Sequence, residues 1–295
     1  MRNPETTPKI TQAMVKAYDD YTHLHLDRRR FMERLTALAG SGAAAAAIAP
    51  MLGASPAQAA MVAADDGRVR GSEVPWPFQG GEMKGYLALP ANASGKLPGV
   101  VVIHENRGLN EHTRDIARRL ALEGFAALAP DFLSPAGGTP ADEEKAREMI
   151  GALDPATTTA SAVSAAAFLR GHEAANGKAG AVGFCWGGGL ANRLAVADPD
   201  LAASVAYYGG QPPAADVPKI KAALMLHYAG LDERINAGIA AYETALKAAG
   251  TRYELHIYDG VNHAFNNDTS AARYNKEAAD LAWGRTVAFL KTHAG

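Results

Sequence analysis

The sequence predicts an α/β fold in which helices cover both faces of a mostly parallel sheet. From Gly71 onward, strand-like and helix-like segments alternate along the chain, which is typical of successive βαβ units. The run Gly99-Val100-Val101-Val102-Ile103 is apolar and β-branched apart from its glycine, as expected of a strand buried on both faces. No repeat, linker or change of composition follows residue 60. We therefore expect one domain over residues 60–295.

Periodicity and turn residues define the individual elements. Ile116 and Leu120 lie at helical spacing, whereas the stretch 134–140 is rich in glycine and proline and predicts a loop. The segment 141–150 begins with acidic residues, which helix N-termini favour. The expected strands are 84–89, 97–104, 125–128, 178–184, 203–208, 222–228 and 253–258, and the expected helices are 113–123, 141–150, 157–172, 237–249 and 271–293.

Composition and charge exclude several classes of protein. The chain has 295 residues, of which 48% are hydrophobic and 20% charged, so it can bury a large core. Its net charge of −2 gives no reason to expect a nucleic-acid partner. A single cysteine excludes an intramolecular disulfide and a cysteine-rich zinc site.

Residues 1–59 carry the pattern of a twin-arginine export signal. The arginines 28–30 are followed by Phe31, an alanine-rich apolar run and an Ala-x-Ala site ending at Ala59. Asp27 and Glu33 depart from the usual pattern. We expect the twin-arginine export machinery as a partner, cleavage after Ala59, and a periplasmic or secreted protein without stable membrane association once cleaved.

Two other interpretations of this segment stay open. Residues 12–26 have the pattern of a short helix with Tyr18 and Tyr21 on one side, so the segment could remain as helices on a cytoplasmic protein. The apolar run 35–52 is also long enough for an uncleaved membrane anchor, although it is rich in Gly, Ala and Pro.

The stretch Gly183-Phe184-Cys185-Trp186-Gly187 has the pattern of a nucleophile elbow. It joins a predicted strand to a segment of small residues, and flanking glycines allow the strand and the following helix to approach closely. Cys185 is then expected above the sheet, beside the partly positive N-terminus of a helix, which favours a thiolate or an oxyanion.

Four chemically active side chains follow directly after predicted strands. In open α/β sheets, ligands bind beyond the carboxyl ends of the strands, and Glu105, Cys185, Asp232 and His263 all lie at such positions. The order nucleophile, acid, histidine is that of the α/β-hydrolase triad. The alternatives are a turn residue for Asp232, a solvated loop carboxylate for Glu105, and His104 as the other histidine at a strand end.

These residue types suit attack on an acyl carbon. A thiol with its ordinary pKa near 8.5 is mostly neutral at pH 7, so it needs a base, for which His263 oriented by Asp232 is the candidate. The resulting thioester would be cleaved by water. Two donors must stabilise the oxyanion, and we expect the backbone N–H groups of Trp186 and Asn106.

From about Gly71 to the end, the chain resembles the dienelactone hydrolase (carboxymethylenebutenolidase) family. The resemblance implies an α/β-hydrolase fold, a Cys-His-Asp triad, and no cofactor or metal. It also implies that Glu105 contacts the resting thiol and helps to deprotonate it when substrate binds. The matching motifs are Gly-Phe-Cys-Trp-Gly-Gly, His-Glu-Asn-Arg-Gly-Leu, Gly-Leu-Asp and Asn-His-Ala-Phe.

One departure from the family concerns the substrate. Family members hold the free carboxylate of a dienelactone with arginines, one of them shortly after the catalytic histidine, but residues 265–268 contain none. We expect a small ester or lactone substrate and name Arg107 as the candidate that binds it, with Arg147 and Arg234 as alternatives.

Two other functions compete with ester or lactone hydrolysis. An exported thiol-redox protein would use Cys185 without hydrolysis, although the chain has no resolving cysteine. A hydrolase fold retained only for binding is the second. A redox cysteine is expected to be a thiolate at neutral pH, whereas the nucleophile of this family is expected to stay protonated until substrate arrives.

Overall fold

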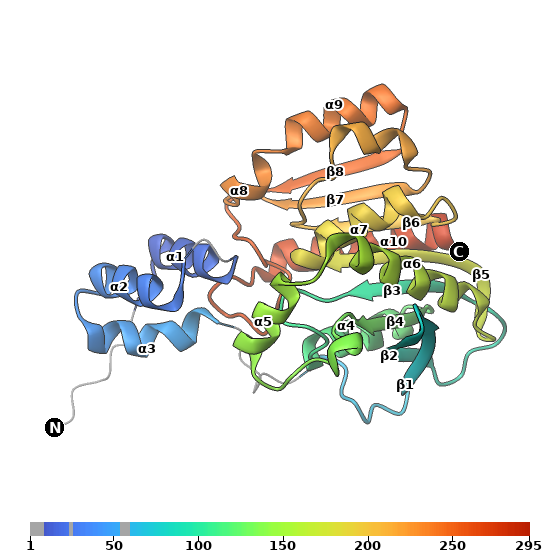
Figure 1. Ribbon diagram of the computed structural model, residues 1–295, viewed down its shortest axis with the longest axis horizontal. Helices are drawn as coiled ribbons and strands as arrows, with labels where there is room; N and C mark the ends of the chain where they lie inside the picture. The colour runs from blue at the N-terminus through green and yellow to red at the C-terminus, as the bar shows by residue number, and fades with distance from the viewer. Residues whose placement is uncertain (1–8, 24–25, 54–59) are drawn as a thin grey trace.

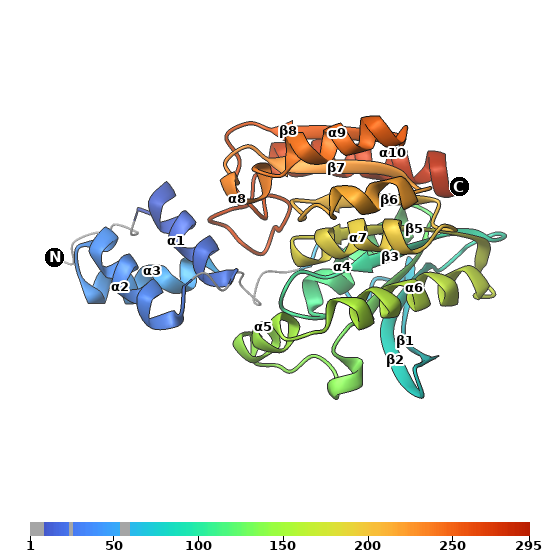
Figure 2. The ribbon, with the colours of Figure 1, turned by 45° about the horizontal axis from the view of Figure 1, so that its top comes forward.

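The computed structural model describes residues 9–23, 26–53 and 60–295. Two parts are seen in Figures 1 and 2: an α/β body, and a smaller group of helices beyond the strand ends that lie near α5 and α8. We call this group the N-terminal unit; it consists of α1 (Gln12–Thr22), α2 (Arg28–Ala39) and α3 (Gly42–Leu52).

The body is built on one eight-stranded sheet, and this confirms the predicted fold class. The strand order is β1-β2-β4-β3-β5-β6-β7-β8. The pairs from β4 to β8 are parallel, whereas β2 runs antiparallel to both of its neighbours. The strands are β1 (Val69–Phe78), β2 (Gly81–Pro90), β3 (Leu97–Ile103), β4 (Ala126–Asp131), β5 (Ala175–Phe184), β6 (Ala203–Tyr207), β7 (Ala223–Ala229) and β8 (Tyr253–Tyr258).

The sequence does not predict β1, because Pro75 and Pro77 argue against a strand. Both prolines are tolerated because β1 lies at the edge of the sheet. The turn into β2 places Gln79 and Gly80 at φ 48° and 77°, which is the left-handed backbone of a tight hairpin.

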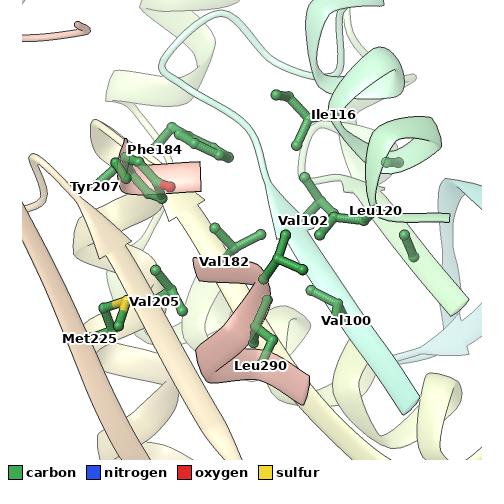
Figure 3. Packing of buried hydrophobic residues seen from close by; sticks show 14 of the residues in the cluster. Val100, Val102, Ile116, Leu120, Val182, Phe184, Val205, Tyr207, Met225 and Leu290 are labelled. Atoms are coloured by element: carbon green, nitrogen blue, oxygen red, sulfur yellow. The ribbon is translucent and has the colours of Figure 1, made fainter. Parts of the chain in front are cut away.

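Helices cover both faces of the sheet, as predicted. On one face, Ile116 and Leu120 of α4 and Leu290 of α10 pack on the strands; Figure 3 shows Val102 and Val182 of neighbouring strands pointing toward Leu290. On the other face lie α6, α7 and α9. The helices of the body are α4 (Glu111–Leu122), α5 (Glu143–Gly151), α6 (Pro155–Gly171), α7 (Trp186–Ala197), α8 (Glu233–Asn236), α9 (Ile239–Ala249) and α10 (Lys276–Ala294).

The N-terminal unit has a small core of its own. Tyr21 stacks on Phe31 with ring centroids 4.8 Å apart, and Leu35 and Leu52 are fully buried. Gly40, at φ 80°, ends α2 and divides the apolar run into two helices. Export and cleavage after Ala59 stay predictions.

The described helices also bear on the membrane-anchor interpretation. Of these helices, none is by itself long and apolar enough to span a bilayer. The helices α2 and α3 meet that criterion only as a pair, and they bend by 112° at their junction.

Candidate active site

Cys185 lies on a strained turn between β5 and α7. Its backbone has φ 57° and ψ −116°, a conformation that costs energy in a residue with a side chain. A Cβ on Gly183 would lie 2.0 Å from the carbonyl oxygen of Gly187, and one on Gly187 would lie 2.4 Å from that of His104. Glycine is therefore required at both positions for the strand and helix to meet at this angle.

His263 and Asp232 meet beside this turn. The Nδ1–H of His263 donates to Asp232 Oδ2 at 2.5 Å, and Asp232 Oδ1 accepts from the backbone N–H of Ile235 at 3.2 Å. A ring nitrogen of His263 lies within 4.8 Å of the sulfur of Cys185. Because Nδ1 is occupied by Asp232, the free nitrogen Nε2 is the one that can exchange a proton with the thiol.

The charges in this group stabilise one another. Burial raises the pKa of the Cys185 thiol, but the imidazoles of His263 and His23 outweigh burial and bring that pKa to about 6. Burial lowers the pKa of His263, yet Cys185, Asp19 and Asp232 hold it well above its ordinary value. The two imidazoles thus favour ionisation of the thiol; that it stays protonated until substrate arrives, as the family resemblance implies, stays a prediction.

The residues after β3 reach the same place. Glu105 Oε2 accepts from Asn267 Nδ2 at 3.0 Å, while its Oε1 is buried without a hydrogen-bond partner among the described residues. Glu105 and Asn106 line a small cavity together with Cys185 and His263. A contact of Glu105 with the resting thiol stays a prediction.

Trp186 is the first residue of α7, so its backbone N–H has no acceptor within the helix. Its indole stacks on His104 at 5.3 Å between centroids, which fixes the turn beside Cys185. The side chain of Asn106 is engaged elsewhere, because its Nδ2 donates to the carbonyl of Thr22 at 2.8 Å.

Arg107 is an ion-paired residue. Its Nη1 contacts Glu143 at 2.8 Å and its Nη2 donates to Tyr18 Oη at 2.8 Å. Arg107 still lines the small cavity beside Cys185. These partners compete with any substrate carboxylate for its charge, and a role in substrate binding stays a prediction.

His23 is a site residue that the sequence reasoning did not identify. Its Nε2 lies 3.3 Å from Cys185 Sγ, although the two residues are 162 positions apart. Its Nδ1 lies 2.8 Å from the backbone oxygen of Asp19 and 3.3 Å from the carboxylate of that residue. The signal in the sequence was a histidine directly after the helix that carries Tyr18 and Tyr21; its place before the arginines made it part of an export signal instead.

A pocket of about 270 Å³ opens beside the sulfur. Cys185, Trp186, Tyr208 and Ile150 form part of its lining. Arg193 also lines it, two turns after Cys185 on α7; among the described residues it has no carboxylate partner, and its Nε donates to Thr159 Oγ1 at 3.4 Å. The other arginines of this pocket are Arg147 and Arg234.

His23, Cys185 and His263 also have the spacing of metal ligands. Their ligand atoms lie within 4.8 Å of one another, the one such group of His, Cys, Asp and Glu side chains in the described part of the chain. Since Sγ and the His23 nitrogen already contact each other, we interpret the group as a hydrogen-bonded acid–base cluster. The absence of a metal or cofactor from the reaction stays a prediction of the sequence.

A mostly parallel sheet flanked by helices, with a sharp strand–helix turn at its carboxyl edge, is the fold of the α/β-hydrolases. The comparisons with known proteins identify the family within this class. The chain belongs to the dienelactone hydrolase family, whose model matches residues 83–294.

Individual relatives agree with this assignment to a hydrolase family. A protein of Escherichia coli O157:H7 named "Putative carboxymethylenebutenolidase" is 31% identical over 257 residues, covering 82% of this chain and 94% of its own. A protein of the same name from Saccharolobus solfataricus is 34% identical, covering 74% and 97%. The crystal structure named "Putative Dienelactone Hydrolase" from Klebsiella pneumoniae has a TM-score of 0.70 at 30% identity, covering 76% and 99%.

Proposed function

We propose that this protein hydrolyses a carboxylic ester or lactone through a thioester on Cys185, with His263 and Asp232 completing the triad. Membership of the dienelactone hydrolase family supports the reaction class. The observation that carries the mechanism is the hydrogen bond of 2.5 Å from His263 to Asp232, which leaves the other ring nitrogen of His263 facing the thiol.

Each residue has a defined task in this reaction. His263 accepts the thiol proton, and the thiolate forms a bond to the acyl carbon. The N–H groups of Trp186 and Asn106 donate to the oxyanion, a contribution of about 3 kcal/mol for one donor in comparable sites. The imidazolium then protonates the departing alkoxide. In the second half, His263 takes a proton from water, hydroxide attacks the thioester, and the C–S bond breaks to restore the thiolate.

The pocket supports a small substrate that carries a negative charge. Its volume of about 270 Å³ suits a compact acyl group. Arg147 and Arg234 have acidic neighbours at 2.7 and 3.9 Å, whereas Arg193 has no carboxylate partner among the described residues. We therefore propose that Arg193 holds a substrate carboxylate. The names of the relatives in E. coli and S. solfataricus point to the same substrate class, an anionic lactone.

One alternative function has an observation in its favour. His263 and His23 lower the pKa of the Cys185 thiol to about 6, and a lowered thiol pKa is typical of a thiol-redox protein. The hydrolase proposal accounts in addition for the His263–Asp232 pair and the strained turn.

The test is catalysis by the full chain and by its Cys185→Ala and Cys185→Ser variants. We expect the wild type to cleave a small activated ester and a dienelactone, to show a burst of alcohol release, and to gain the mass of one acyl group on Cys185. Wild-type rates in Cys185→Ala, or an oxidised Cys185 with no turnover of any ester or lactone, would overturn the proposal in favour of another nucleophile or of the redox function.

The cellular location rests on the sequence, and we propose export by the twin-arginine route. The test is N-terminal sequencing of the protein recovered from separated cell fractions. We expect the protein outside the cytoplasm; a start at residue 60 supports cleavage after Ala59, and full-length protein in the cytoplasm overturns export.

A further inference from the structure

We propose that His23, held by Asp19, is a second catalytic imidazole that acts on the sulfur of Cys185. The inference rests on the proposed thiol mechanism and concerns the full chain, in which the N-terminal unit is present. It means that the active site is built from both parts of the molecule.

The hydrogen bonds fix the orientation and tautomer of His23. A carbonyl oxygen can only accept, so Nδ1 must carry the proton that it shares with the backbone oxygen of Asp19 at 2.8 Å. The other nitrogen, Nε2, then faces Cys185 Sγ at 3.3 Å. His263 has the same arrangement, with Nδ1 on Asp232 and Nε2 free. Two histidines, each oriented by an aspartate, thus converge on one sulfur.

The α/β body binds the end of α1 at several points. The last carbonyl groups of a helix lack intrahelical donors, and two residues of the body supply them. Arg147 Nη1 donates to the oxygen of Tyr21 at 3.0 Å, and Asn106 Nδ2 donates to that of Thr22 at 2.8 Å. Cationic groups at this end also favour the helix dipole. His23 follows directly, so these contacts place its ring.

The hydroxyl groups of α1 are also engaged by the body. Arg107 Nη2 donates to Tyr18 Oη at 2.8 Å, and Tyr21 Oη donates to Glu144. The guanidinium of Arg273 lies 5.1 Å from the ring centroid of Tyr18. Arg107 therefore has a task that its place in the His-Glu-Asn-Arg-Gly motif did not reveal, which is to hold the helix that carries His23.

The surroundings favour an imidazolium at His23 beside a thiolate. The acidic and titratable groups around it are Asp19 on its own helix, Cys185, His263 and, across the small cavity, Glu105. The cations that line the two cavities with His23 are Arg107, Arg147, Arg193, Arg234 and Arg273. Burial lowers the pKa of His23, but Cys185 and the Asp19 carboxylate outweigh burial and His263, raising it to about 9.

Two imidazoles allow the acid and the base of the reaction to be separate groups. In this form of the mechanism, His23 takes over from His263 in the first half of the reaction and holds the thiol proton while the thiolate forms the S–C bond. The C–O bond breaks and His23 gives its proton to the departing oxygen. His263 then takes a proton from water, hydroxide attacks the thioester, and the C–S bond breaks. The acid product leaves, the thiolate is restored, and the proton on His263 returns to His23 through the sulfur between them.

The test compares His23→Gln and His23→Ala in the full chain with two controls that touch neither the sulfur nor the pocket beside it. Arg29→Ala changes an exposed arginine of α2, and His293→Gln changes a histidine at the end of α10. We measure kcat/KM against pH, the pH dependence of Cys185 alkylation by iodoacetamide, rescue of His23→Ala by imidazole, and thermal unfolding.

We expect both His23 variants to lose about 100-fold or more in kcat/KM, their alkylation profile to move to higher pH, and imidazole to restore part of the activity of His23→Ala. Both controls should behave as wild type. Asp19→Asn keeps the histidine and the backbone acceptor of its Nδ1–H but removes the carboxylate charge 3.3 Å away. It should therefore show a smaller shift in the same direction, and it provides a second reading if either His23 variant unfolds.

Failure of this inference is distinguishable from failure of the proposed function. Wild-type kinetics and alkylation in the His23 variants, with an inactive Cys185→Ala, would overturn the role of His23 and leave the thiol mechanism standing. A loss of activity with an unchanged alkylation profile and no rescue by imidazole would also overturn it, because His23 would then be structural. An active Cys185→Ala would overturn the thiol mechanism itself.

Discussion

The two parts of the molecule differ in how they are held together. In the α/β body, two large clusters of apolar side chains cover the two faces of one sheet. In the N-terminal unit, a single small cluster joins three short helices, and a group of that size buries too little surface to be stable alone. Its contacts with the body must therefore contribute to its stability. Cys185 belongs to the α/β body and His23 to the N-terminal unit.

The largest expected effect is on the stability of the α/β body. Gly183→Ala would place a methyl group 2.0 Å from the oxygen of Gly187, so we expect a loss of about 3 kcal/mol or more in the free energy of unfolding and of measurable esterase activity. Chemical denaturation and ester hydrolysis measure these. The matched control is Gly284→Ala on α10, where a Cβ meets no atom within 4 Å; equal stability of the two variants would contradict the prediction.

The second effect is a loss of stability confined to the N-terminal unit. Leu35 is fully buried in the N-terminal unit, and truncating such a leucine costs about 2–5 kcal/mol. We expect Leu35→Ala to make residues 9–53 sensitive to limited proteolysis and to lower kcat/KM as the His23 variants do, while the body melts as wild type. Arg29→Ala, at an exposed position, is the control. Equal destabilisation of both parts would show that they unfold as one unit.

A third effect tests the electrostatic contact between the parts. Burial raises the pKa of Asp19, but His263, His23 and Arg234 outweigh it and lower that pKa from 3.8. A carboxylate with a lowered pKa contributes stability that is present above its unfolded pKa and is lost as pH falls below it. This loss is complete only below the folded pKa. We expect Asp19→Asn to cost about 1–2 kcal/mol at pH 7 and a clearly smaller amount at pH 2. A constant difference between these pH values would exclude the carboxylate charge as the cause.

The smallest effect concerns substrate choice. Arg193→Ala should raise KM for an anionic lactone about tenfold, the equivalent of 1.4 kcal/mol, and leave a neutral ester unaffected. Arg107→Ala should also hurt anionic lactones more than neutral esters if Arg107 binds substrate. Equal loss on both substrates would remove Arg107 from substrate binding and fit its contact with Tyr18.

The sequence predicted the body well because its signals are local. A buried parallel strand is continuously apolar, as in residues 97–103, and catalytic side chains follow such strands directly. The strand β1 was not predicted. Its prolines, Pro75 and Pro77, are tolerated only at the edge of the sheet, and edge position is a property of the whole sheet. The start of α10 at Lys276 was placed too early, at 271, because composition does not define a helix boundary.

The contact of His23 could not be predicted for a different reason. It joins the end of α1 to a turn that lies 162 residues later, and neither segment contains a local pattern that predicts a contact with the other. The same residues that suggest an export signal also fit a helical pattern in which Tyr18, Tyr21 and Phe31 are buried. Which of the two structures such a segment adopts depends on the surface against which it packs, and a single sequence does not show that surface.

The proposed role of His23 would connect the predicted cleavage after Ala59 with the chemistry of the site. If the chain is cut after Ala59, as we predict for an exported protein, the thiol keeps His263 and loses its second proton carrier. Precursor and product would then be two enzymes of one fold with different pH optima. The specific activity of a preparation would report how much of it still has residues 1–59, and the peptidase that removes them would regulate the hydrolase.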